Sequence, residues 1–182
     1  LLYFIIIFVA SCIHLNNFMK KKLLLLFVWV NLGFSVFAVN TKPFTIPEIK
    51  EWKGGEGTMI FSGRIVCNGV TESRVARQLA ADYRRMFGTE PAIIQGKAQK
   101  GDIVLSLKGG GALGEEGYTM AVKNQAVVTA RTGKGLYWAT RTLLQLFEQS
   151  KDRALPQGFA HDVPDYPFRG FMLDCGRKFF SM

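Results

Sequence analysis

The stretch Tyr118-Thr-Met-Ala-Val-Lys-Asn-Gln-Ala-Val-Val-Thr-Ala130 is the clearest guide to the fold. Its two five-residue runs, 118–122 and 126–130, are rich in apolar and β-branched side chains and flank the polar break Lys123-Asn-Gln125. Runs of this kind suit a pleated, half-buried surface, and a short polar break between them is typical of a β-hairpin. The stretch therefore predicts a pair of antiparallel strands.

Upstream of this hairpin the chain alternates between apolar runs and residues that break regular structure. Pro43 and Pro47 block a helix, so an extended N-terminal segment is expected over residues 39–57, with Gly54-Gly-Glu-Gly57 as a turn. Short apolar runs then predict strands at residues 58–61, 64–67, 91–94 and 102–107.

A helix is expected from Glu72 to Phe87, between the second and third of those strands. Its apolar side chains recur at helical spacing, Thr71 or Ser73 can cap its start, and Gly88 suits its end. Arginines cover the rest of its surface with Asp82 among them, which favours a solvated face over an anion-binding row.

A second helix is expected from about Lys134 to Gln149, after the hairpin, with Trp138 packed on it. Strands, helix, strands and helix follow one another in the chain. This order predicts an α+β domain over residues 58–150, a small sheet with both helices on one face.

The N-terminal residues have the three parts of a secretory signal between Met19 and Ala38. Lys20 to Lys22 form a basic start, an apolar core follows, and Val36-Phe-Ala38 ends in residues that a signal peptidase accepts. Export to the periplasm or the medium is expected, with no stable membrane span after cleavage, since the apolar core is short for a bilayer. A retained anchor is the alternative, and residues 1–18 are interpreted as an over-extended reading frame.

Charge and cysteine content exclude several classes of function. The formal net charge is +9, and without Lys20 to Lys22 the chain keeps 20 basic against 14 acidic residues, spread without a stripe, so no nucleic-acid partner is expected. Cys67 and Cys175 lack the spacing of a metal site, and two buried free thiols are favoured over a disulfide. No metal and no cofactor are expected.

Two further motifs mimic functional sites. Gly109-Gly-Gly-Ala-Leu-Gly114 matches the dinucleotide fingerprint, but a strand and not a helix is expected after it, so it reads as a flexible loop. His161-Asp162 stands in a polar stretch, with no serine or cysteine nucleophile in a strand-to-helix elbow to accompany it. That stretch, residues 151–165, is expected to be a linker between domains.

The closing residues 166–182 read as a buried strand that begins after Pro167 and ends at Asp174. A strand of this kind is expected to open a new domain. The chain is therefore expected to be the front end of a longer enzyme, cut at the start of its catalytic part.

Here the sequence resembles a known family, the family 20 glycoside hydrolases, which are β-N-acetylhexosaminidases. The resemblance covers about residues 58–182, and the Arg-Gly…Asp-x-x-Arg string is its most specific part. The matching segments are Gly117-Tyr-Thr-Met120, Val128-Thr-Ala130, Gly135-Leu-Tyr-Trp-Ala-Thr-Arg-Thr-Leu-Leu-Gln-Leu146 and Tyr166-Pro-Phe-Arg-Gly-Phe-Met-Leu-Asp-Cys-Gly-Arg-Lys-Phe-Phe180.

The resemblance implies an α+β accessory domain followed by a (β/α)8 barrel, with residues 166–182 as the first barrel strand. It implies substrate-assisted, retaining removal of terminal N-acetylglucosamine or N-acetylgalactosamine from glycans. An Asp orients the substrate's acetamido group and an adjacent Glu protonates the leaving oxygen. Both lie on a later barrel strand, so no catalytic residue is expected within this chain, and the chain alone is expected to be inactive.

The resemblance also implies roles for three residues of the closing segment. Arg169 is expected to bind hydroxyls of the terminal sugar, with a structural salt bridge as the alternative. Asp174 and Arg177 are expected to form a supporting ion pair near the mouth of the barrel. The family often has His where Lys178 stands, so the resemblance implies no particular role for that side chain. The rival functions are the accessory domain of another exported glycosidase and a non-catalytic carbohydrate-associated module.

Overall fold

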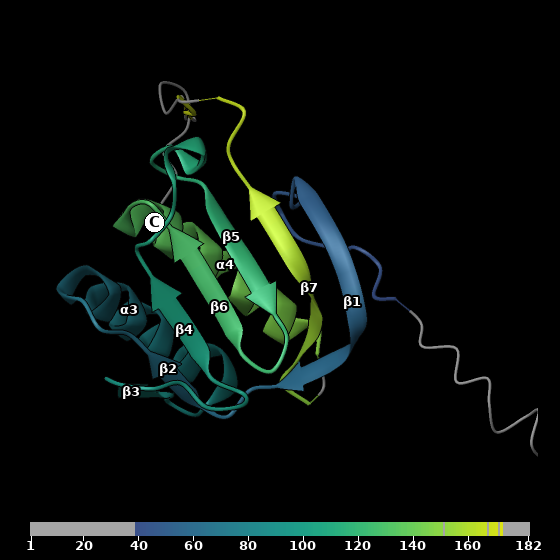
Figure 1. The fold of residues 1–182 in the computed structure, drawn as a ribbon, viewed down its shortest axis with the longest axis vertical. Coiled ribbons are helices and arrows are strands. Elements are labelled where there is room, and N and C mark those ends of the chain that lie inside the picture. The colour runs from purple at the N-terminus through teal and green to yellow at the C-terminus, as the bar shows by residue number, and fades with distance from the viewer. Residues whose placement is uncertain (1–38, 151, 167, 171, 173–182) are drawn as a thin grey trace, which may run out of the picture. The chain divides into compact units, whose positions relative to one another are not determined.

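The computed structural model describes residues 39–150, 152–166, 168–170 and 172 (Figure 1). The signal sequence predicted at 19–38 and most of the closing segment, including Asp174 and Arg177, lie outside these residues. The elements, in chain order, are β1 (Glu51–Ile60), β2 (Arg64–Val66), α3 (Val70–Phe87), β3 (Ala92–Ile94), β4 (Ile103–Ser106), a 3-10 turn (Gly111–Leu113), β5 (Tyr118–Val122), β6 (Ala126–Ala130), α4 (Gly133–Glu148) and β7 (Ala154–Asp162).

The strands form one seven-stranded sheet with the order β1-β7-β5-β6-β4-β2-β3. The predicted hairpin is confirmed, since β5 and β6 pair antiparallel from Tyr118 with Ala130 to Val122 with Ala126. Strands β2, β3, β4 and β6 run parallel to one another, whereas β5, β7 and β1 are joined by antiparallel pairings. The hairpin thus joins a parallel half of the sheet to an antiparallel half.

Both helices lie on one face of the sheet, behind the strands in the view of Figure 1. Alternate residues of β5 and β6 point toward them and are buried, which explains the period of two in the hairpin sequence. Leu136 and Leu143 of α4 and Leu79 of α3 complete this core. Four aromatic rings fill one part of it, with centroids 4.6–6.4 Å apart, and they belong to Phe61, Tyr83, Phe87 and Phe147.

The helix ends follow from local chemistry, with one exception. Thr132 caps α4 by accepting hydrogen bonds at Oγ1 from the backbone N–H groups of Lys134 and Gly135. Gly88 ends α3 in the left-handed conformation, as predicted, and its N–H donates to the carbonyl of Arg84. The predicted cap by Thr71 or Ser73 is wrong, because α3 already begins at Val70, after Gly69, without a side-chain cap.

Two predictions about the antiparallel half are wrong. Gly54 to Gly57 do not form a turn but lie inside β1, where the register shifts between Gly54 and Thr58. Residues 154–162, predicted as linker, form β7, which pairs with β1 on one side and β5 on the other. Local rules disfavour a strand with Pro156 and Gly158. Pro156 is tolerated because it pairs with Thr58 of β1 alone and lies outside the residues that pair with β5, which begin at Gly158.

None of the helices in the described part of the chain is long and apolar enough to cross a membrane. Cys67 is a buried free thiol, as predicted for that residue. Gly109 to Gly114 form a loop that contains the three-residue 3-10 turn and leads into β5, so no α-helix begins at these glycines.

Candidate functional site

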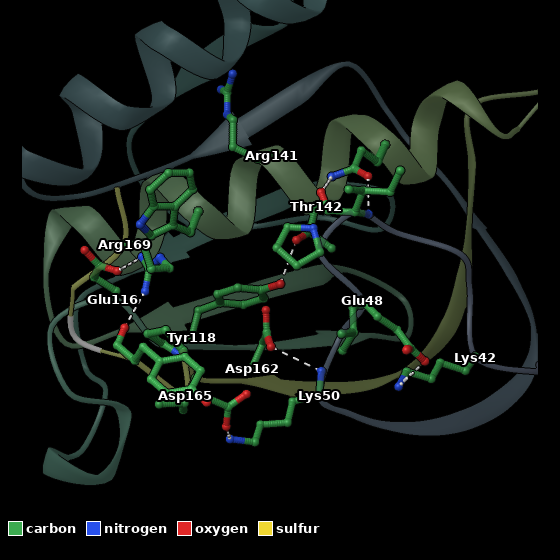
Figure 2. A pocket seen from close by; sticks show the side chains of 18 residues that line it. Lys42, Glu48, Lys50, Glu116, Tyr118, Arg141, Thr142, Asp162, Asp165 and Arg169 are labelled. Atoms are coloured by element: carbon green, nitrogen blue, oxygen red, sulfur yellow. Dashed lines mark hydrogen bonds and ion pairs between the residues drawn. The ribbon is translucent and has the colours of Figure 1, made fainter. Parts of the chain in front are cut away.

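A pocket of about 810 Å3 opens at the end of the sheet where β5 begins and β7 ends (Figure 2). Its walls come from residues 42–50 before β1, the exposed side of α4, and the residues that come after β7. The chain leaves the sheet beside this pocket, so the pocket is the candidate site.

Tyr118, the first residue of β5, lines the pocket from its buried position in the core. Its hydroxyl shares a hydrogen bond of 2.6 Å with Oγ1 of Thr142 on α4. Burial raises the pKa of Tyr118 well above the usual range, so this hydroxyl stays neutral at physiological pH. Figure 2 shows Asp162, the last residue of β7, next to the same ring.

Two glycines allow α4 to begin directly on top of β5. A Cβ atom on Gly135 would lie 2.4 Å from the carbonyl oxygen of Gly117, far closer than real contacts allow. A Cβ atom on Gly117 would in turn lie 2.8 Å from Cγ2 of Val163 and 3.1 Å from the carbonyl oxygen of Asp162. The end of β7, the start of β5 and the first turn of α4 therefore touch through their backbones.

Trp138 lies on the exposed side of α4 and lines the pocket, with 43% of its surface exposed. The sheet takes the opposite face of α4, so Trp138 packs on its own helix, as predicted, and faces the pocket instead of the core. Its ring meets Tyr137 edge-on, at 5.4 Å between centroids, and the guanidinium of Arg141 lies 4.6 Å above the Tyr137 ring. Trp52, within the segment predicted to be extended, lies in β1 and packs against the core.

Arg141 also joins the two helices. Its Nη1 donates to Oδ2 of Asp82 on α3 at 2.7 Å, and Gln78 donates to both oxygens of the same carboxylate. Burial alone would raise the pKa of Asp82, but the hydrogen bonds from Gln78 and Arg141 and the charges of Arg141 and Arg85 outweigh it and hold that pKa below its ordinary value. Asp82, predicted on a solvated face, is therefore a buried link between the helices.

Ion pairs surround the mouth of the pocket. Lys42 lies 2.8 Å from Glu48, and Lys50 pairs with Asp165 just after β7. The hydrogen bond with Asp165 raises the pKa of Lys50. The backbone N–H of Lys50 also donates to Oδ1 of Asp162 at 3.1 Å, so the segment before β1 is tied to the end of β7.

Of the three residues predicted from the closing segment, the structure describes only Arg169, and it brings Arg169 to this pocket. Its Nη2 donates to a carboxylate oxygen of Glu116, and its Nη1 donates to the carbonyl oxygen of Tyr166 at 2.8 Å. Sequence reasoning did not single out Glu116. Its partner lies 53 positions away in the chain, and no local pattern signals such a pair.

The acidic side chains on the rim of this pocket are paired with basic ones. Among the residues that the structure describes, no three His, Cys, Asp or Glu side chains gather where they could hold a metal ion. His161 lies within β7, with Nδ1 at 3.4 Å from Glu51, instead of in a linker. The carboxylates on the pocket rim, Glu48, Glu116 and Asp165, each face a basic side chain.

A mixed seven-stranded sheet with two helices on one face defines the class of small α/β domains. The particular family follows from sequence. Residues 42–163 match the family model described as glycosyl hydrolase family 20, domain 2, and the chain belongs to this family. No curated protein sequence matches the chain.

Solved structures of family 20 enzymes have the same fold. The β-N-acetylhexosaminidase of Streptomyces coelicolor A3(2) is 27% identical with a TM-score of 0.64, over 78% of this chain and 31% of that chain. The enzyme of Streptomyces plicatus, in complex with Thio-NAglucal, is 26% identical with the same TM-score and coverage. An exo-β-N-acetylglucosaminidase of Vibrio harveyi, at 20% identity and a TM-score of 0.59 over 81% of this chain and 23% of that chain, shows the fold alone. The chain therefore spans less than a third of these proteins.

Proposed function

We propose that this chain is the N-terminal part of an exported β-N-acetylhexosaminidase that removes terminal N-acetylglucosamine or N-acetylgalactosamine from glycans. One observation carries the proposal. The match to domain 2 ends at residue 163, and the string Arg169-Gly…Asp174-x-x-Arg177 comes within a few residues. The accessory domain comes first and the Arg-Gly…Asp-x-x-Arg string follows it, which is the order expected where a family 20 barrel begins.

The reaction proposed for the whole enzyme is substrate-assisted. The carbonyl oxygen of the substrate's 2-acetamido group attacks the anomeric carbon, an Asp orients that group, and a Glu protonates the leaving oxygen. The Asp-Glu pair belongs to a part of the barrel beyond Met182. The chain supplies the accessory domain and the first barrel strand, and none of the catalytic carboxylates.

Arg169 keeps the two roles proposed for it, as a sugar ligand or as part of a structural salt bridge. Its contacts with Glu116 and Tyr166 support the salt bridge. They occupy two N–H groups, and the guanidinium has further N–H donors for sugar hydroxyls. Asp174 and Arg177 remain proposed as a supporting ion pair at the barrel mouth.

Hydrolysis of p-nitrophenyl N-acetyl-β-glucosaminide tests the proposal. A longer protein that carries this chain should release p-nitrophenol, whereas the 182-residue chain alone should release none. The matched control is p-nitrophenyl β-glucoside, which has no acetamido group and should not be hydrolysed by a substrate-assisted mechanism. Turnover by the chain alone, or equal turnover of the two substrates, contradicts the proposal.

Two rival functions, the accessory domain of another exported glycosidase and a non-catalytic module, are separated by the coding DNA past Met182. A His-x-Gly-x-Asp-like stretch followed by an adjacent Asp-Glu pair supports the hexosaminidase. A stop codon directly after Met182 favours the module. Export is tested by sequencing the N-terminus of the mature protein, which should begin at Val39.

The accessory domain itself is proposed to support the barrel and not to bind glycan. Its exposed aromatic side chain at the pocket, Trp138, lies beside the point where the chain leaves the sheet, which suits contact with the next domain. Titration of the chain with chitin oligomers in a calorimeter should give no binding heat. Saturable binding that is lost in Trp138→Ala contradicts this role.

A further inference from the structure

After β7 the chain passes along the rim of the pocket, in what we term the exit segment, the described residues 163–166, 168 and 169. Two ion pairs tie this segment to the accessory domain, Lys50 with Asp165 and Glu116 with Arg169 (Figure 2). The two anchoring residues come from different parts of the chain, Lys50 from before β1 and Glu116 from before β5.

Glu116 is the better-shielded anchor of the two. The side chain of Glu116 is 25% exposed, against 46% for Lys50, and their partners Arg169 and Asp165 are 47% and 68% exposed. Water screens an ion pair less as its partners become more buried. Arg169 also donates to the carbonyl oxygen of Tyr166, so one guanidinium contacts both the domain and the exit segment.

The position of Glu116 is set by the backbone beside it. Gly117 lies so close to the end of β7 that an added Cβ would come within 2.8 Å of Val163. This contact fixes the backbone at Gly117, so the side chain of the adjacent Glu116 leaves the chain at a defined position relative to the exit segment.

The preceding residue, Glu115, has a different partner. Its Oε2 lies 3.2 Å from Nζ of Lys134 in the first turn of α4. The two adjacent carboxylates therefore carry the same charge in the same loop but hold different elements. This pairing provides a matched control for any substitution of Glu116.

We propose that Glu116 is a positioning residue, whose carboxylate holds Arg169 and so fixes where the polypeptide leaves the accessory domain and enters the catalytic region. A carboxylate suits this task because a planar guanidinium presents N–H groups in a fixed geometry and keeps its charge at any physiological pH. The existence of a catalytic region rests on the proposed function, but the contact between Glu116 and Arg169 does not.

The contact can be tested in the 182-residue chain by limited trypsin digestion followed by mass spectrometry. Trypsin must take the side chain of Arg169 into its specificity pocket, so release from Glu116 should speed cleavage of the Arg169–Gly170 bond. Glu116→Gln should raise that rate about twofold to fivefold, and 1 M NaCl should bring the wild type close to the variant. Glu115→Gln should match the wild type, and cleavage after Arg141 in α4 reports any general unfolding. Equal rates for Glu116→Gln and the wild type overturn the proposal.

The effect on catalysis is tested in a longer protein that has hexosaminidase activity. Glu116→Gln should lower kcat/KM several-fold and Glu115→Gln should not. Glu116→Asp, which keeps the carboxylate and leaves Arg169 in place, should retain at least half of the wild-type kcat/KM. If Glu116→Asp loses as much as Glu116→Gln, the positioning role is overturned. If the wild-type longer protein has no activity, the proposed function is contradicted. The contact between Glu116 and Arg169 is still tested by the trypsin experiment, which needs no activity.

Discussion

The two ends of the sheet hold their carboxylates in opposite ways. At one end, before β4, Asp102 is fully buried and takes hydrogen bonds from Ser62 Oγ at 2.7 Å and the Gln99 N–H at 2.7 Å. Arg64 adds an ion pair at 3.2 Å. At the other end, before β5, Glu116 pairs with Arg169 at the open rim of the pocket.

The two carboxylates differ in what they hold. Asp102 stabilises the fold of the domain, whereas Glu116 holds a neighbouring segment at the surface. A buried carboxylate costs free energy unless it is fully hydrogen-bonded, and Asp102 meets that condition within the domain. A part-exposed pair such as Glu116–Arg169 contributes little to folding but places a charged group at the surface. We therefore expect substitutions at the closed end, near Asp102, to act on folding. Substitutions at the open end, near Glu116, should act on the position of the exit segment.

The largest effect is expected at the closed end. Asp102→Ala leaves Ser62, Gln99 and Arg64 without their acceptor and should lower the free energy of unfolding by about 3–5 kcal/mol, measured by urea denaturation. Asp152→Ala, at an exposed aspartate, should change it by less than about 0.5 kcal/mol. Equal effects of the two substitutions contradict the comparison of the two ends.

The pH dependence of the free energy of unfolding distinguishes the buried carboxylate of Asp82 from exposed carboxylates. Its folded pKa lies below the unfolded value, so Asp82 stabilises the fold fully above about pH 5 and loses this contribution as pH falls through the folded pKa. Asp82→Asn should cost about 2 kcal/mol at pH 7 and progressively less toward pH 2, measured by urea denaturation at each pH. A cost that stays constant over this range contradicts the assignment.

Gly117 tests the close backbone contact at the open end. Gly117→Ala should lower the free energy of unfolding by about 1–3 kcal/mol, because the new Cβ overlaps the Leu113 carbonyl, Val163 and Asp162. Gly111→Ala, where an added Cβ meets nothing within 4 Å, is the matched control. The midpoint temperatures of thermal unfolding of the two variants test this prediction. Equal midpoint temperatures contradict the close backbone contact.

The smallest effect on the isolated chain is expected for Trp138 on the pocket wall. Trp138→Ala should change the free energy of unfolding by less than about 1 kcal/mol, since much of the ring is already in water. Leu143→Ala on the buried face of the same helix should cost about 3 kcal/mol. If Trp138→Ala proves as costly as Leu143→Ala, the ring belongs to the core and not to an interface.

Local patterns predicted much of the fold. The hairpin at 118–130 and both helices follow from side-chain periods within a few turns or strands, and Gly88 ended its helix as predicted. The strand β7 could not be predicted, because its partner β1 lies about 100 positions upstream and its sequence contains Pro156 and Gly158. The glycines at 54–57 were misread as a turn for the same reason, since a shift in strand register needs the partner strand to be visible.

The candidate site was predictable only in part. The closing string singled out Arg169, whose role as a sugar ligand stays a prediction, but its partner Glu116 carried no signal of its own. The exposure of Trp138 depends on which face of α4 the sheet covers. Apolar side chains lie on several sides of this helix, so their spacing in the sequence does not identify the buried face.

The hairpin, both helices and the family resemblance, which the match over residues 42–163 confirmed, could all be read from the sequence alone. These depend on neighbouring residues and on ordered strings, which a chain displays without folding. The folded structure was needed to show that β7 lies inside the sheet, that Asp82 and Asp102 are buried acceptors, and that Glu116 meets Arg169. Those features join residues dozens of positions apart, and hydrogen bonding and burial fix them only once the sheet has formed.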